Sequence, residues 1–115
     1  MSAADVLSVV VGLLFLVTGG VKVVGLPQSL AIRDHFGMSA QLWRVIGALE
    51  CAGAVGALLS IWLRDLGLLA LAGLAALMLG AVGSRIRVRD PLPLMAFDVA
   101  VLALVVVTFC ARWSA

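Results

Sequence analysis

Four long apolar stretches, joined by short polar connections, constrain the fold of this chain more than any other feature. They cover about residues 6–24, 42–63, 66–84 and 92–110. A helix needs roughly 20 apolar residues to cross a bilayer. Of the 115 residues, 64% are hydrophobic and only 12% are charged, too little polar surface for an ordinary water-soluble domain. We therefore predict an all-α fold, an integral membrane four-helix bundle forming a single transmembrane domain over residues 1–115.

The connection between the first two apolar stretches contains a segment of its own, QSLAIRDHFGM at residues 28–38. It is too short and too polar to span a bilayer, so we predict a short interfacial helix here. We expect His35, the single histidine, to be solvated at the interface rather than catalytic. Ser39 is a suitable N-cap for the second span, and Trp43 suits the headgroup level.

The connection between the third and fourth apolar stretches is basic, with Arg85, Arg87 and Arg89 alternating with aliphatic residues. This pattern favours a loop lying against anionic headgroups. Pro91 and Pro93 suit the start of the fourth span, because the first turn of a helix needs no donor from proline.

The charges are distributed unequally between the two ends of the predicted bundle. We call the end with both termini and the Arg64–Asp65 turn the terminal side, and the end with the two other connections the basic side. The terminal side carries Arg64 and Arg112, whereas the basic side carries six cations: Lys22, Arg33, Arg44, Arg85, Arg87 and Arg89. The positive-inside rule then places the basic side in the cytoplasm and both termini outside. We expect a multi-pass protein of a bacterial-type cell (inner) membrane.

Two carboxylates, Glu50 and Asp98, fall within the predicted spans. At 1.5 Å per residue, Glu50 lies roughly 12 Å and Asp98 roughly 7–9 Å from the starts of their spans, both measured from the basic side. Lys22, Arg44 and Arg85 approach the membrane from the same side. Intramembrane charges are costly and usually functional or paired. We predict that these five residues form a polar cluster, a candidate binding site, in one leaflet.

Helix geometry indicates how the cluster is paired. Arg44 and Glu50 are six residues apart, so they point about 120° apart and do not pair along one helix. Glu50 shares its face with small residues, where another helix packs. We expect Glu50 to face the bundle interior, with Lys22 or Arg85 as its partner, and Asp98 to need a partner too. The cluster is then either a structural ion network or a pocket for a headgroup, a quinone-like ring or a proton.

Other kinds of site find little support in the sequence. A net charge of +2 without an exposed basic face argues against nucleic acid as a partner. Cys51 and Cys110 form no CxxC pair and belong to different spans, so we expect neither a disulfide framework nor a metal site. No catalytic residue can be assigned, and no cofactor is evident, although a quinone fits the cluster.

Three segments together carry a family resemblance. They are GGVKVVG in the first span, RVIGALECAGAVGALL in the second and GLAALMLGAVGSRIRVRD at the end of the third. In this order they resemble the DoxX family of small four-helix membrane proteins, over about residues 12–90. Lys22, Arg44 and Glu50 match charged positions of the family. Where the family pattern often has a histidine before the basic loop, this chain has Ser84 and Arg85.

The resemblance implies a membrane subunit linked to quinone-dependent thiosulfate oxidation or to an oxidative-stress complex with soluble enzymes. Our first hypothesis is therefore an accessory or anchoring subunit of a membrane-associated, oxidoreductase-type complex, not an enzyme on its own. The alternatives are a quinone-linked oxidoreductase component, or a binder or transporter of a small lipophilic or protonated species. The expected partners are the lipid bilayer, a soluble or membrane protein, and further copies of the chain.

Overall fold

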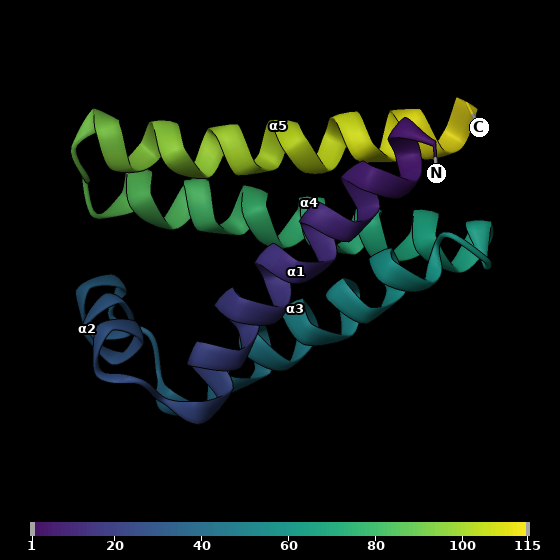
Figure 1. Cartoon of the computed structure of the whole chain (residues 1–115). Helices are drawn as coiled ribbons and strands as arrows, with labels where there is room; N and C mark the ends of the chain where they lie inside the picture. The colour runs from purple at the N-terminus through teal and green to yellow at the C-terminus, as the bar shows by residue number, and fades with distance from the viewer. Residues whose placement is uncertain (1, 115) are drawn as a thin grey trace.

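The structure is a computed structural model that describes residues 2–114, and within this range it contains five helices and no strand (Figure 1). The helices are α1 (Ala3–Val24), α2 (Pro27–Phe36), α3 (Ala40–Leu59), α4 (Arg64–Arg87) and α5 (Leu92–Ser114). All but α2 are long and apolar enough to cross a membrane. The predicted all-α bundle of four spanning helices and one short helix is therefore confirmed.

The four long helices pack as two pairs, α1 with α3 and α4 with α5. The pairs join through α3 and α4, and less extensively through α1 and α5. Figure 1 shows the pairs diverging toward the basic side, where α2 lies across the gap between them. Chain ends lie at the opposite, terminal side. The bundle is thus a wedge, narrow at the terminal side and wide at the basic side.

Local sequence signals explain where the first three helices begin and end. Ser2 and Asp5 form a reciprocal capping box at the start of α1, and Ser39 caps α3 as predicted, accepting a hydrogen bond from the Leu42 amide (3.1 Å). Gly25 and Gly37 end α1 and α2 in the left-handed conformation, with φ of 81° and 69°. Glycine adopts this conformation without a Cβ clash, so both reversals around α2 are local to the sequence.

Helix α3 ends at Leu59, four residues before the predicted end of the second span at Leu63. The Ser60 hydroxyl donates to the Ala57 carbonyl (2.6 Å) and lies 3.1 Å from the Ser8 hydroxyl of α1. These bonds turn the chain out of the helix. Because hydroxyls form such local bonds in competition with the helix ladder, apolar patterning alone placed the end too late.

Helix α4 runs through Arg87, beyond the predicted third span at Ser84, so the loop predicted from Arg85 onward is wrong for its first three residues. The last turn continues because it packs against α5 and holds the Arg85 side chain inward. Arg89, with φ of 57°, then reverses the chain, and Pro91 precedes the first residue of α5.

The buried core between the long helices contains Val11, Phe15, Ala54, Ala57, Leu71, Leu74, Met78 and Val105. Phe15 and Met78 also line the cavity described below, and the rest of the core lies nearer the middle and the terminal side. Small residues allow backbones to approach closely between α3 and α4: a Cβ added at Gly67 would lie 2.0 Å from Ser60 Cβ, and one at Gly56 would lie 2.4 Å from Ala70 Cβ. The basic side lacks this close α3–α4 approach, which leaves room for the candidate site.

Candidate functional site: a cavity beneath α2

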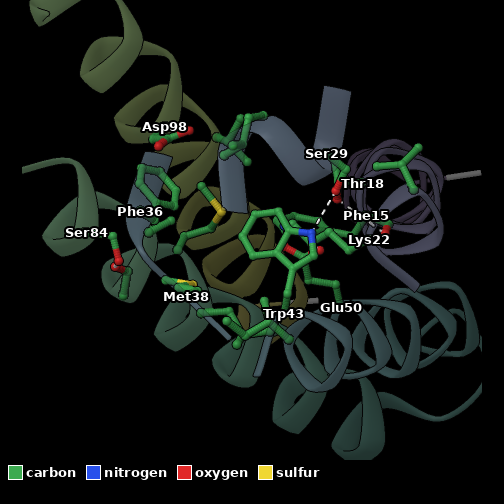
Figure 2. Close-up of a pocket in the computed structure, with 18 of the residues that line it drawn as sticks. Phe15, Thr18, Lys22, Ser29, Phe36, Met38, Trp43, Glu50, Ser84 and Asp98 are labelled. Atoms are coloured by element: carbon green, nitrogen blue, oxygen red, sulfur yellow. Dashed lines mark hydrogen bonds and ion pairs between the residues drawn. The ribbon is translucent and has the colours of Figure 1, made fainter. Parts of the chain in front are cut away.

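A cavity of about 470 Å³ occupies the wide end of the wedge and is lined by residues from all five helices. Most of its lining is apolar. Polar groups enter from every helix; they are Thr18, Lys22, Gln28, Ser29, Glu50, Ser84, Arg85 and Asp98. Figure 2 shows Trp43 in the middle of this view, with Lys22 and Glu50 on one side and Ser84 and Asp98 on the other. The cavity therefore has an apolar body and two separate charged walls.

The first charged wall is the ion pair between Lys22 of α1 and Glu50 of α3. Lys22 Nζ donates to Glu50 Oε1 (2.6 Å) and Oε2 (2.8 Å). Glu50 is buried, with 4% of its surface exposed. Gly47 makes the pair possible, because a Cβ there would lie 2.7 Å from Lys22 Cβ. The expectation that Glu50 faces the interior and finds a partner on another span is confirmed, and Lys22 is that partner.

Trp43, one turn into α3, forms the floor between the two walls. Its indole Nε1 donates to the Ser29 hydroxyl of α2 (2.8 Å), and Lys22 Nζ lies 5.1 Å from its ring centroid. The Trp43 side chain also contacts Phe36 edge to face. Only 4% of the Trp43 surface is exposed, so the side chain packs inside the bundle and fastens α2 over the cavity. Its position at the headgroup level stays a prediction.

The second charged wall centres on Arg85 of α4. Arg85 Nε donates to Asp98 of α5, and Arg85 Nη1 donates to Asp90 Oδ2 (2.9 Å). Asp90 in turn contacts His35 Nε2, and the guanidinium of Arg85 lies 5.3 Å from the Phe36 ring centroid. Asp98 was expected to need a partner, and that partner is Arg85. The chain of contacts continues outward to His35, whose side chain is half exposed.

Asp90 lies in the connection between α4 and α5 and joins these helices to α2. Its hydrogen bond with His35, together with the bond from Arg85, holds the pKa of the Asp90 carboxyl below its usual value of 3.8. A second tie runs beside it, because the Arg87 guanidinium donates to the Phe36 carbonyl. These contacts attach α2 to the α4–α5 pair, while Trp43 attaches it to α3.

Four of the five residues predicted to form the polar cluster line the cavity: Lys22, Glu50, Arg85 and Asp98. They make two separate pairs rather than one network. Arg44 does not join them; its side chain is exposed and lies outside the cavity lining. The one-residue step from Trp43 to Arg44 turns the side chain by about 100°, so burying the tryptophan places the arginine outside.

The sequence did not predict a role for Asp90 at this site, nor a connection of His35 or Trp43 with the cluster. Asp90 stands beside two prolines at a predicted loop, which signals a turn but not burial. The available signal for Trp43 was its position seven residues before Glu50, two helical turns along the same face. The sequence left open whether the cluster is a structural ion network or a binding pocket. The structure combines the two, because closed ion pairs form walls of a cavity.

A further buried charge, which the sequence did not predict, lies at the terminal side. Arg112 of α5 donates to Asp5 Oδ1 (2.9 Å) and to the Ser8 hydroxyl (2.9 Å). The Ser8 hydroxyl donates to the Ala4 carbonyl and also meets Ser60, which directly follows α3, so α1, α5 and the end of α3 are joined here. This network contributes nothing to the cavity lining. Its signal in the sequence was the early N-cap at Ser2, which brings Asp5 into the helix.

Among residues 2–114, no group of three or more His, Cys, Asp or Glu side chains is arranged to hold a metal ion. Cys51 and Cys110 are both free thiols. The ionisable side chains that line the cavity are those of the two ion pairs, Lys22–Glu50 and Arg85–Asp98. They can orient a ligand by hydrogen bonds and charge.

Comparison with known proteins gives one result that covers most of the chain. No curated protein and no solved structure gives a significant match. Residues 6–108 match the DoxX-like family, a range that includes most of α1 and α5, all of α3 and α4, and every charged residue of the cavity. With four helices long and apolar enough to span a bilayer, the chain is a multi-pass membrane protein, and it belongs to the DoxX-like family.

Proposed function

We propose that the protein binds a small, largely apolar molecule with hydrogen-bond-accepting oxygens, of the quinone class, in the cavity beneath α2. The observation that carries this proposal is an apolar cavity of about 470 Å³ with a charged wall on each of two sides. Ligand sites in proteins are typically mostly apolar spaces of about 300–1,000 Å³ with a few polar groups that fix orientation. A bundle built only for anchoring would not need such a space.

The polar and aromatic side chains around the cavity suit an oxygen-bearing ring. An ammonium group has three donors, and Glu50 uses two of them, so one remains for a carbonyl oxygen. Trp43 also lines the cavity, so an aromatic ring bound there would contact the indole. Thr18 and Ser84 donate to carbonyls of their own helices, so the lone pairs of their hydroxyls remain available to a donor on the ligand.

Trp43 fluorescence provides the test. The chain has three tryptophans, and Trp62 and Trp113 are exposed. In a Trp62→Phe/Trp113→Phe background, titration with a short-chain ubiquinone analogue should quench Trp43 to saturation, because quinones quench an indole at contact. The matched control is Trp43→Phe, which retains the two exposed tryptophans and should show only non-saturating quenching. Equal behaviour of the two proteins would refute binding in the cavity.

A paired substitution tests the role of the Lys22 wall. Lys22→Met/Glu50→Gln removes both charges at once and leaves no lone buried charge. Loss of one hydrogen bond from a charged donor, about 1.5 kcal/mol, should weaken the analogue roughly tenfold. Asp5→Asn, in the ion pair at the terminal side, should leave the affinity unchanged. An affinity that is unchanged in the paired variant would exclude this wall as the contact.

The role of the chain in a larger assembly, predicted from the sequence as an accessory or anchoring subunit, stays a prediction. A quinone held here would serve such a complex, because a partner protein could exchange electrons with it. The transport role also stays a prediction.

We also infer that the basic side faces the cytoplasm of a bacterial-type cell membrane. The side that carries α2 holds six of the eight lysines and arginines, and Arg44, Arg87 and Arg89 are exposed there. Single-cysteine variants at Arg44 and at Trp62, in a Cys51→Ala/Cys110→Ala background, test this inference. A membrane-impermeant maleimide added to intact cells should label the cysteine at position 62 and not the one at 44. The reverse pattern would invert the topology.

A further inference from the structure

Two residues that line the cavity are exposed in the middle of a spanning helix. Ala76 and Gly80 of α4 belong to the cavity lining, yet both are exposed on the surface of the bundle. A Cβ added at Gly80 would meet no neighbouring atom within 4 Å. The wall of the cavity is therefore incomplete at this part of α4.

The incomplete wall lies at an edge of the α3-facing side of α4. Leu74 and Ala70, which contact Gly53 and Gly56 of α3, mark that side nearer the terminal side of the bundle. At 100° per residue, Gly80 points about 80° from Ala70 and about 120° from Leu74, so it flanks the contact with α3. Across the gap, the lining continues with Ile46 of α3 and Met38 of the α2–α3 connection. We call this opening, bordered by Met38, Ile46, Ala76 and Gly80, the α3–α4 window.

The depth of the window decides what lies outside it. Helix α4 has 24 residues, and Ala76 lies near its midpoint. At 1.5 Å per residue, Gly80 lies roughly 10 Å from the basic end of the helix. Because the hydrocarbon layer is about 30 Å thick, the window faces acyl chains rather than water. The arginines Arg85 and Arg87, by contrast, mark the level of the headgroups.

We propose that the cavity opens sideways into the hydrocarbon layer through the α3–α4 window, and that its occupant is a chain-bearing amphiphile that arrives from the bilayer. The polar head of this molecule lies against the charged walls, and its apolar chain passes between Ile46 and Gly80 into the lipid. The quinone identity of the head rests on the proposed function. The window rests only on the exposed lining and its depth, so the two can fail separately.

Quenching by brominated lipid tests the window without any quinone. The protein carries Trp43 as its single tryptophan and is placed in phosphatidylcholine vesicles whose acyl chains are brominated near the headgroup end. Because only 4% of Trp43 is exposed, its quenching reports chains that enter the cavity. Gly80→Leu should fill the window and remove most of the quenching, and Ala76→Leu should do so independently.

The matched control is Gly73→Leu, on the same helix. Gly73 lies seven residues from Gly80, about 20° away on the same face, and also has no atom within 4 Å of an added Cβ, yet it does not line the cavity. Gly73→Leu should keep the quenching of the parent protein. Absence of Trp43 quenching in the parent, or equal quenching in Gly80→Leu and Gly73→Leu, would overturn the window.

The short-chain ubiquinone analogue then separates the two proposals. If it displaces the brominated chain from Trp43, and Gly80→Leu slows its association and dissociation alike, both proposals hold. If brominated chains quench Trp43 and the analogue neither binds nor displaces them, the window stands and the quinone assignment fails. If the analogue binds Trp43 at the same rate in Gly80→Leu and Gly73→Leu, the binding site stands and the window is wrong.

Discussion

At the terminal side of the bundle a buried arginine is enclosed by three helices, whereas at the basic side two buried ion pairs border an open space. Arg112 meets Asp5 and Ser8 where α1, α3 and α5 converge. Lys22–Glu50 joins α1 to α3 and Arg85–Asp98 joins α4 to α5, and these two helix pairs diverge at the basic side. Buried charges thus serve two purposes in one small protein, joining helices at one end and lining a cavity at the other.

The difference between the ends follows from the size of the side chains between the helices. Near the terminal side, Gly56 and Gly67 let α3 and α4 touch through backbone and Cβ atoms. Near the basic side, Phe36 and Trp43 stand between the helix pairs and hold α2 in the gap. Small residues close one end of the wedge, and large aromatic residues keep the other end open. Charge alone does not make a cavity; the spacing of the helices does.

The largest expected effect comes from leaving one carboxylate unpaired at the basic side. Lys22→Met strands the Glu50 charge, and breaking a buried pair in this way costs about 3–5 kcal/mol. Arg112→Met at the terminal side should cost less, because Asp5 sits at a helix start with 20% of its side chain exposed and keeps its capping box. Unfolding in detergent with added denaturant measures both, and Lys22→Met/Glu50→Gln should recover most of the loss. A smaller loss for Lys22→Met than for Arg112→Met would show that water in the cavity solvates Glu50.

A smaller effect should follow from adding a single methyl group to α4 at each end. Gly67→Ala places a Cβ against Ser60 in the closed end and should cost about 1–3 kcal/mol through overpacking. Gly80→Ala in the window meets no atom and should stabilise slightly, by roughly 0.4–1 kcal/mol, because alanine loses less entropy on folding. Thermal unfolding of the two variants provides the comparison. Similar losses in both would mean that α3 and α4 are equally close along their whole length.

The smallest effect concerns the attachment of α2 and depends on pH. The pKa of Asp90 is lower in the folded protein than its usual 3.8, because His35 and Arg85 bond to the carboxylate. The stabilisation that these bonds give to the folded protein is therefore complete above pH 3.8. It is lost as the pH falls through the lowered pKa of Asp90. Trp43 emission in the single-tryptophan background should then shift as α2 loosens, and Asp90→Asn should remove that part of the shift. A pH profile identical in Asp90→Asn would exclude Asp90 as the titrating group.

Much of the architecture could be predicted because spanning a bilayer is a local property. Each of the four long helices satisfies its own backbone hydrogen bonds and needs only about 20 apolar residues in sequence. The short helix α2, the cap at Ser39 and the interior position of Glu50 follow from local patterns of the same kind. The ends of α3 and α4 were predicted less accurately, because Ser60 and Arg85 are held by partners on other helices.

The sequence by itself determined that four apolar helices would cross a membrane and that buried charges must be paired, since both follow from the cost of placing polar groups in hydrocarbon. Only the tertiary structure decided which charges pair and whether space remains between them. Lys22 rather than Arg85 joins Glu50, Arg44 faces outward while Trp43 faces in, and Asp90 ties α2 to the bundle. The physical reason is that pairing and cavity volume depend on the distance between helices, and that distance is set by contacts between residues far apart in the chain.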